Sequence, residues 1–285
     1  MSFDNKKSDK ELSLEHKAQS LTGCSVMCQK DCAFFGFHPI LMMCRVHQKI
    51  TSDSEMSDEP GWKYYFNSIP LDCKDLFKDG HTDSGVYNIY PYGTMTSPVR
   101  VYCHMETMDG GWTAIQKRID GSLSFERNWI DYKNGFGTPE QEVWIGNDII
   151  HQLTKGGYST LYVSITLANG SRLYELYDRF SVSNETEKYQ LLLEGPATGT
   201  LGDSMINTEY PNNAMPRMYF STADRDYDKT GGNCALSWGG GWWFNACSDA
   251  FLNGPWAPER WRNPWYPTVS YGGIVGKTLM MIKRH

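Results

Sequence analysis

The sequence lacks the patterns that mark several large classes of protein. No run approaches the roughly 18 apolar residues that a membrane-spanning helix needs, and the densest apolar stretch covers only 38–44. Because the net charge is −6, the composition offers no basic face for nucleic acid. Collagen triplets, sustained heptads and internal repeats are absent too. We therefore predict a globular chain with no membrane span and no nucleic-acid partner.

Motifs of catalysis are also missing. The seven histidines form no HExxH pattern, and the chain has no GxSxG elbow, phosphate-binding loop or glycine-rich dinucleotide fingerprint. His151 lies in a predicted helix, where a structural role is the simpler interpretation. We predict that the protein is not an enzyme and has no catalytic residues.

Cysteines are plentiful and indicate an oxidising compartment. The chain has eight, an even number, with no CxxC pair and only His38 among them, so zinc is poorly supported. Two N-glycosylation sequons begin at Asn169 and Asn184. The first residues are polar and lack an apolar signal core. We expect a secreted glycoprotein whose signal peptide is absent from this sequence.

Composition divides the chain into a polar N-terminal tail (1–17), a small unit (18–67), a linker (68–72) and a large unit (73–285). Apolar residues at spacings of three and four predict a short helix from Ala18 to Cys28. Short strands are expected at 32–37, 43–46 and 62–66. A unit of this size buries little surface, so we expect it to be stapled by disulfides.

Four cysteines of the small unit permit three pairings, of which Cys24–Cys44 with Cys28–Cys32 is the plausible one. Their spacing, C-x3-C-x3-C-x11-C followed by GWKYY, resembles a partial PAN/apple module that lacks the family's outermost cysteine pair and first strand.

From Cys73 onward, glycine-rich turns separate many short apolar runs. Residues 158–168 and 172–182 alternate apolar and polar side chains around Asn-Gly-Ser, which predicts a β-hairpin. A helix is expected over 147–153. Six of the ten tryptophans lie between 238 and 265.

Ordered motifs of the large unit resemble the fibrinogen-related domain. They are GGWTAIQKR (110–118), FERNW (125–129), DYKNGFG (131–137), WIGND (144–148) and GGWWFNAC (240–247). The resemblance implies an α+β fold with a central antiparallel sheet and a loop-rich C-terminal subdomain that carries calcium and ligand. It also implies the disulfides Cys73–Cys103 and Cys234–Cys247, and core roles for Trp242 and Trp243.

Residues 224–234 (DRDYDKTGGNC) carry carboxylates at alternate positions, which suits a hard cation that prefers oxygen ligands. The family's calcium loop aligns here without a gap before Cys234. The resemblance therefore implies Ca²⁺ as the cofactor. Its ligands would be Asp226, Asp228, Thr230 and Gly232, and Asp224 would support these ligands without binding the ion.

Lectins similar to tachylectins and ficolins bind an acetyl group beside this loop, next to a cis peptide before the second cysteine. The equivalent bond here is Ala246–Cys247. Carried over, the family's pocket falls on Trp238, Ser248, Trp256 and Ala257, with Trp261, Trp265 and Tyr266 as further wall candidates. Trp238 and Ser248 replace the tyrosine and the histidine that are usual in the lectins.

The leading hypothesis from the sequence is a secreted, calcium-dependent lectin for acetylated glycans, acting in innate immunity as a homo-oligomer. The alternative is a protein-binding ligand of the angiopoietin or fibrinogen type, whose partner is a receptor or matrix protein. Competition by free acetate distinguishes the two hypotheses, because acetate is expected to displace an acetylated glycan but not a protein partner.

Overall fold

The computed structural model describes residues 2–4, 7–8, 14–27, 34–47, 56–57, 60–66, 69–93, 98–206, 210–257, 260–270 and 274–285. The chain divides into two compact units. Unit 1 comprises Met1–Pro70 and Tyr92–Pro98, and unit 2 comprises Leu71–Pro91 and Val99–His285. Among the described residues, every helix is too short or too polar to cross a membrane.

Unit 1 is built on a five-stranded antiparallel sheet in the order β1–β7–β4–β5–β3, beside a two-stranded sheet of β2 and β6 and the helix α1 (Leu21–Met27). The strands are β1 (Ser2–Asp4), β2 (Lys7–Ser8), β3 (Leu14–Lys17), β4 (Phe34–His38), β5 (Met43–His47), β6 (Met56–Ser57) and β7 (Lys63–Phe66). A disulfide joins Cys24 of α1 to Cys44 of β5 and completes a small core with Ala18, Phe35 and Phe37. The predicted partners Cys28 and Cys32 lie outside the described residues.

The N-terminal segment differs from the polar tail expected over 1–17. β1 and β3 both lie in this segment and pair with the sheet, with His16 opposite Cys44 and Phe3 opposite Tyr64. Strand pairing uses backbone N–H and C=O groups, so a polar sequence can join an existing sheet without an apolar pattern of its own.

Unit 2 is organised by a nine-stranded antiparallel sheet. Seven strands follow the order β11–β12–β10–β16–β13–β14–β15, while β9 pairs with both β10 and β8. The strands are β8 (Gly85–Ile89), β9 (Val99–His104), β10 (Trp112–Arg118), β11 (Phe136–Gly137), β12 (Val143–Trp144), β13 (Ser159–Leu167), β14 (Arg172–Val182), β15 (Leu191–Gly199) and β16 (Val275–Arg284). The expected central antiparallel sheet is confirmed. β16 brings the end of the chain into its middle, between β10 and β13.

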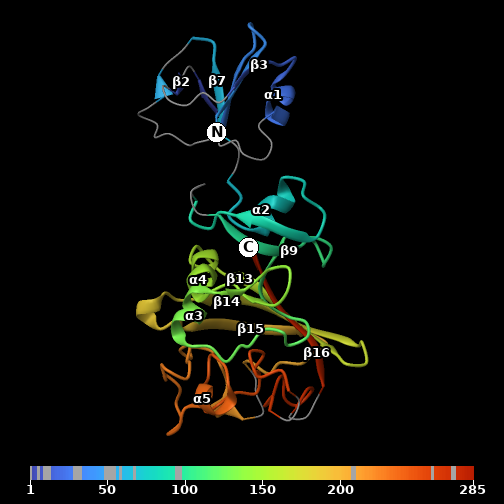
Figure 1. The fold of residues 1–285 in the computed structure, drawn as a ribbon, viewed down its shortest axis with the longest axis vertical. Helices are drawn as coiled ribbons and strands as arrows, with labels where there is room; N and C mark the ends of the chain where they lie inside the picture. The colour runs from blue at the N-terminus through green and yellow to red at the C-terminus, as the bar shows by residue number, and fades with distance from the viewer. Residues whose placement is uncertain are drawn as a thin grey trace. The chain divides into compact units, whose positions relative to one another are not determined.

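Short helices surround this sheet: α2 (Cys73–Lys78), α3 (Trp129–Asn134), α4 (Asn147–Thr154) and α5 (Cys234–Trp238), with 3₁₀ turns at Glu185–Glu187 and Pro211–Asn213. Asp72, Asn128 and Asn233 cap the first, second and last of the four α-helices through their side-chain oxygens. In Figure 1, α2 lies at one end of unit 2, and the loop-rich segment that carries α5 lies at the other end.

The predicted hairpin at 158–182 is present as β13 and β14, with Thr166 opposite Arg172 at the turn. Gly170 takes φ +86° there, a left-handed conformation that favours glycine. Disulfides join Cys73 to Cys103 and Cys234 to Cys247.

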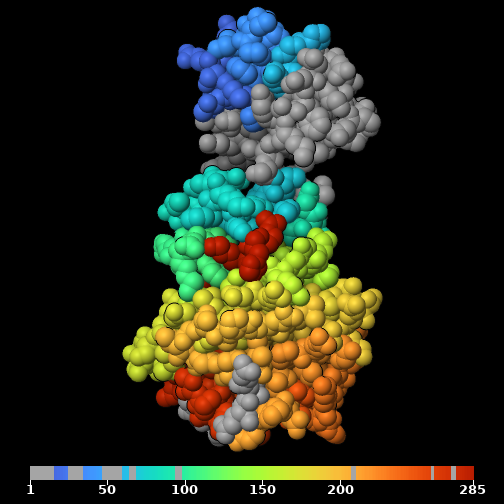
Figure 2. Space-filling model, turned by 180° about the vertical axis from the view of Figure 1, so that it is seen from behind, coloured from blue at the N-terminus to red at the C-terminus, as the bar shows by residue number. Residues whose placement is uncertain are grey.

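The two faces of the sheet bury different cores. Met280 and Ile282 of β16 belong to the main core, which includes Trp129, Trp144 and Trp243 and underlies the C-terminal loops. Leu279 and Met281, which alternate with them, belong to a second core with Trp112, Ala114 and Tyr162. Figure 2 shows the end of the chain in red at the surface of unit 2, bordered by green and yellow-green atoms of earlier segments.

Candidate calcium and ligand site

Asp228 organises the acidic loop before α5. Its Oδ1 accepts hydrogen bonds from the N–H and the hydroxyl of Thr230, at 2.8 and 2.9 Å, and its Oδ2 accepts the N–H of Cys234 at 2.7 Å. The Thr230 hydroxyl also lies 2.7 Å from the carbonyl oxygen of Gly232. The Thr230 hydroxyl therefore lies between the carboxylate of Asp228 and the carbonyl of Gly232 and keeps them close together.

Asp226 adds a second carboxylate to the same loop. Its Oδ1 accepts the N–H of Asp228 at 3.1 Å. Burial raises the pKa of Asp226, and the neighbouring Asp228 carboxylate raises it further. In the part of the chain that the structure describes, no three His, Cys, Asp or Glu side chains converge on a metal position. An ion here depends on two carboxylates and backbone carbonyls, a donor set that fits a hard cation such as calcium.

The base of this loop is tied to α3. Asp224 Oδ1 accepts the N–H of Trp129 at 2.9 Å and the hydroxyl of Thr222 at 2.8 Å. Glu185 accepts the indole N–H of Trp129 at 2.8 Å and pairs with Lys133 at 2.6 Å. Asp224 thus connects the base of the loop to the start of α3.

The Ala246–Cys247 peptide bond is cis. The N–H of Ala246 donates to the carbonyl of Asn212 at 2.9 Å, and Cys247 is bonded to Cys234 at the start of α5. Ala246 is exposed and Cys247 is half-buried. The acidic loop, α5 and the 210–213 segment therefore meet around this bond.

Ser248 does not offer a donor to a ligand in this arrangement. Its side chain is fully buried, and its hydroxyl donates to the carbonyl of Ala250 at 2.7 Å. Trp238 is partly buried, and its ring packs against Phe244 and Phe251 with centroids 5.8 and 5.9 Å away. The two residues that replace the lectin donors therefore serve mainly to pack the loops.

Trp256 belongs to a different cluster. Its ring lies 5.3 Å from that of Trp261 and 5.1 Å from the guanidinium of Arg118. Ala257 follows it and is half-buried. Among the described residues, no hydrogen bond or ring contact joins Trp256 or Ala257 to the Ala246–Cys247 segment. Of the wall candidates, Trp261 and Trp265 are buried, and the N–H of Tyr266 donates to the carbonyl of Asp249, two residues after Cys247.

Residues 69–278 match the family model described as fibrinogen beta and gamma chains, C-terminal globular domain. The chain belongs to this family. Human fibroleukin is 44% identical over 195 residues, which cover 68% of this chain and 44% of fibroleukin. Human angiopoietin-2 is 38% identical over 218 residues, covering 74% of this chain and 42% of its own length. The chain thus spans less than half of the length of these curated relatives.

Solved structures show the same fold. The fibrinogen-like globe domain of human ANGPTL2 superposes with a TM-score of 0.69 at 36% identity, covering 75% of this chain and 98% of that one. A lamprey fibrin D-dimer complexed with the peptide Gly-His-Arg-Pro-amide gives a TM-score of 0.66 at 30% identity, covering 75% and 73% of the two chains. The expected fibrinogen fold is confirmed.

A pair of tyrosines in the fibrinogen domain belongs to two segments that hydrogen-bond to Ala246 and to Asp249, on either side of the cis bond. Tyr210 is 52% exposed, and its ring lies 6.2 Å from that of Tyr266. The N–H of Tyr266 donates to Asp249, and Asn213 donates its amide to the Asp249 carboxylate at 2.8 Å. Tyr210 was not predicted as a site residue, because its YPNN sequence matches no binding motif. Its position near the site follows only from the fold, which brings residues 210–213 close to Ala246.

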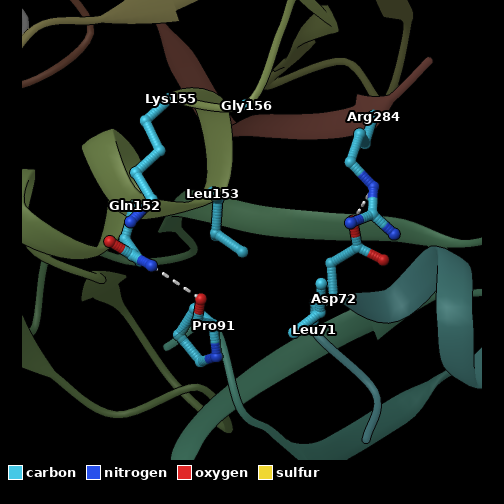
Figure 3. A pocket seen from close by; sticks show the side chains of 8 residues that line it. All are labelled: Leu71, Asp72, Pro91, Gln152, Leu153, Lys155, Gly156 and Arg284. Atoms are coloured by element: carbon cyan, nitrogen blue, oxygen red, sulfur yellow. Dashed lines mark hydrogen bonds and ion pairs between the residues drawn. The ribbon is translucent and has the colours of Figure 1, made fainter. Parts of the chain in front are cut away.

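A pocket of about 150 Å³ lies elsewhere in the fibrinogen domain (Figure 3). Its walls come from the start of α2, the end of α4 and the end of β16, and none of the predicted site residues lines it. Asp72 and Arg284 form an ion pair at 3.3 Å on one side, and Gln152 donates to the carbonyl of Pro91 at 2.8 Å on the other. Burial raises the pKa of Asp72, although Arg284 opposes this shift.

Proposed function

We propose that this chain is a noncovalent binding protein whose fibrinogen domain recognises a partner protein through its C-terminal loops. The observation that carries the proposal is its relation to fibroleukin and angiopoietin-2, at 44% and 38% identity. The partner would be a receptor or matrix protein, as in the alternative drawn from the sequence.

The surface beside the cis bond supports a protein partner. Tyr210 and Tyr266 form an aromatic pair there, and Leu236 of α5 is 67% exposed. Exposed tyrosines are enriched among residues that dominate protein–protein binding energy. The lamprey fibrin D-dimer was solved with a bound peptide, which is consistent with peptide recognition by this fold.

Acetylated glycans are the second candidate ligand. An acetyl pocket needs donors for the carbonyl oxygen and apolar walls for the methyl group. Since the Ser248 hydroxyl is buried and bonded to Ala250, this chain has lost a donor at the expected position. A protein partner is therefore the better supported reading.

We expect the double variant Tyr210→Ala/Tyr266→Ala to lose at least tenfold in affinity for its partner, because central aromatic side chains typically contribute about 1–2 kcal/mol each or more. An array of receptor ectodomains, probed with the labelled full chain, identifies the partner and measures the loss. Leu192→Ala on β15 is the control. Retention on N-acetylglucosamine beads that is lost to both acetate and EDTA, with no ectodomain bound, would instead establish the lectin.

Calcium is proposed as the cofactor, held by the carboxylates of Asp226 and Asp228 and the carbonyls of Thr230 and Gly232. A bound ion would neutralise the two adjacent carboxylates and hold the 224–234 loop against α5. This chain's own contribution is the positioning of Asp228 by Thr230 and Cys234, and of Asp224 by Trp129.

Removing calcium is expected to lower thermal stability. If the free ion is present at about 100 times its dissociation constant, binding stabilises the folded state by roughly 2.7 kcal/mol. Differential scanning calorimetry in calcium and then in EDTA measures the shift in Tm, with Asp228→Asn as the matched variant. Equal Tm values for the wild type in both buffers would exclude a calcium site of this strength.

Secretion is proposed as well, because three described disulfides suit an oxidising compartment. Asn169 and Asn184 both lie exposed in turns, and we propose both as N-glycosylation sites. The Thr186 hydroxyl donates to Asn184 Oδ1 at 2.6 Å, which leaves the amide nitrogen of Asn184 accessible for modification.

A further inference from the structure

Four cations lie on the face of the central sheet that holds the second core. They are Lys117 of β10, Arg172 of β14, and Lys277 and Lys283 of β16. Successive side chains of a strand point to opposite faces, so Lys277 and Lys283 share the face of Leu279 and Met281. With the aromatic residues Tyr102, Trp112 and Tyr162, these four cations make up what we call the basic face.

Each of three cations in the basic face covers an aromatic ring. Lys117 lies 4.5 Å from the centroid of Tyr102, Lys283 lies 5.5 Å from Trp112, and Arg172 lies 5.9 Å from Tyr162. Beneath them Trp112 and Tyr162 are only 3% and 4% exposed. The charged groups of these cations lie over the rings, and the buried Trp112 and Tyr162 are not accessible for stacking.

The cations lie close enough to act together. Thr166 of β13 is opposite both Arg172 and Lys277, so these two residues are two strands apart, about 10 Å between backbones. Burial lowers the pKa of Lys117, the carboxylate of Glu140 opposes this shift, and the charge of Lys277 adds to it. Burial, together with Arg172 and Lys117, lowers the pKa of His104 to about 4, so this histidine is neutral at pH 7.

Among the residues that the structure describes, none of the four cations has a carboxylate oxygen within 4.0 Å. The carboxylates of Glu140 and Glu194 pair instead with Arg100 and Arg179. Lys117 Nζ donates to the carbonyl oxygens of Pro139 and Glu140 at 2.7 and 3.2 Å. A chain with a net charge of −6 thus carries a local cluster of positive charge on this sheet, with no direct carboxylate partner among the described residues. Net charge averages over the whole surface, so an acidic composition is compatible with a local basic face on this sheet.

We propose that the basic face binds a linear sulfated polysaccharide. Sulfate groups are compact anions that lysine and arginine hold by charge and hydrogen bonds, without ring stacking. Binding of single-stranded nucleic acid relies on bases that stack on exposed aromatic rings, whereas Trp112 and Tyr162 are buried here. The disulfides indicate an oxidising, extracellular setting, where the abundant linear polyanions are sulfated polysaccharides.

The test uses the full chain on immobilised heparin as the probe. The wild type is expected to remain bound at about 0.15 M salt. Each removed charge near an anionic surface is expected to weaken binding about fivefold, so Arg172→Gln/Lys277→Gln should bind roughly 25-fold more weakly. Its plot of log affinity against log salt should also be less steep by about two. Arg217→Gln/Arg262→Gln removes two exposed charges from the C-terminal loops and is expected to bind like the wild type.

Other outcomes would overturn the proposal. They are no retention of the wild type, equal losses in the two double variants, or retention on desulfated heparin or single-stranded DNA as strong as on heparin. Equal Tm values across the variants exclude misfolding as the cause of a loss. Retention is expected to persist in EDTA, since the basic face shares no residue with the 224–234 loop, so the result is independent of the proposed calcium site and protein partner.

Discussion

Replacing Glu142 with alanine is expected to lower the free energy of unfolding by about 4 kcal/mol. The Glu142 side chain is 1% exposed, and its Oε1 accepts the backbone N–H groups of Ile119, Asp120 and Gly121 at 2.7, 2.9 and 2.8 Å. Its Oε2 accepts the N–H of Leu123 at 3.1 Å. Removing the carboxylate leaves four backbone N–H groups without this acceptor. The cost is large because a buried donor without an acceptor has lost its hydrogen bonds to water and gained none in the protein.

Glu142 also balances a buried cation. Arg118 is 1% exposed, donates to the carbonyl of Gly254, and lies 4.2 Å from the ring of Phe125. Burial lowers the pKa of Arg118 to about 10, while Glu142 opposes that shift, so the guanidinium stays charged at neutral pH. Without Glu142, the charge of Arg118 is buried with less compensation, and residues 119–123 lose the acceptor of their N–H groups.

Thermal unfolding followed by circular dichroism measures the effect of Glu142→Ala. For a domain of about 200 residues, a loss of 4 kcal/mol lowers the Tm by roughly 8–16 °C. Glu140→Ala is the matched control, since Glu140 is half exposed and pairs with Arg100 at the surface, where such pairs contribute about 1 kcal/mol or less. Equal Tm values for the two variants would show that the carboxylate of Glu142 has no special role.

Local sequence patterns predicted the local structure of this chain well. The hairpin around Asn169 and the helix at 147–153 depend on neighbours in sequence, through turn chemistry and apolar spacing, and both are present as β13–β14 and α4. The strands β1 and β3 were missed because their sheet partners, β7 and β5, are remote in sequence. No hydrophobic periodicity within residues 1–17 indicates that these segments pair with remote strands.

The site was less predictable, because exposure and hydrogen-bond partners depend on the tertiary fold. A serine at position 248 is compatible with a ligand donor, yet its hydroxyl is buried against Ala250. Glu142 and Arg118 lie within ordinary-looking charged segments, and only the folded chain reveals that both are buried. The acidic loop differs, because the predicted ligands lie close together in sequence, from Asp226 to Gly232. Neighbours in sequence therefore suffice to bring Asp228, Thr230 and Gly232 into hydrogen-bond contact.

Replacing Trp243 with alanine is expected to be the most damaging single change in the core, at about 5 kcal/mol. Trp243 is fully buried, and its ring centroid lies 5.2 Å from Phe220, 5.3 Å from Trp242 and 6.1 Å from Trp144. Its indole N–H donates to the carbonyl of Tyr189 at 2.8 Å. The truncation therefore creates a large cavity and also leaves a buried carbonyl without this donor.

The position of Trp243 gives this loss a functional consequence. Trp144 belongs to the central sheet, whereas Trp243 lies in the segment that leads to Ala246 and Cys247. The cavity thus opens between the sheet and the loops that carry the proposed binding surface, so we expect partner binding to fall together with stability. Urea unfolding followed by far-UV circular dichroism measures the stability. Leu236→Ala, at a position 67% exposed, is expected to change it by less than about 0.5 kcal/mol. Similar values for the two variants would contradict the assignment of Trp243 as the residue that joins the loops to the sheet.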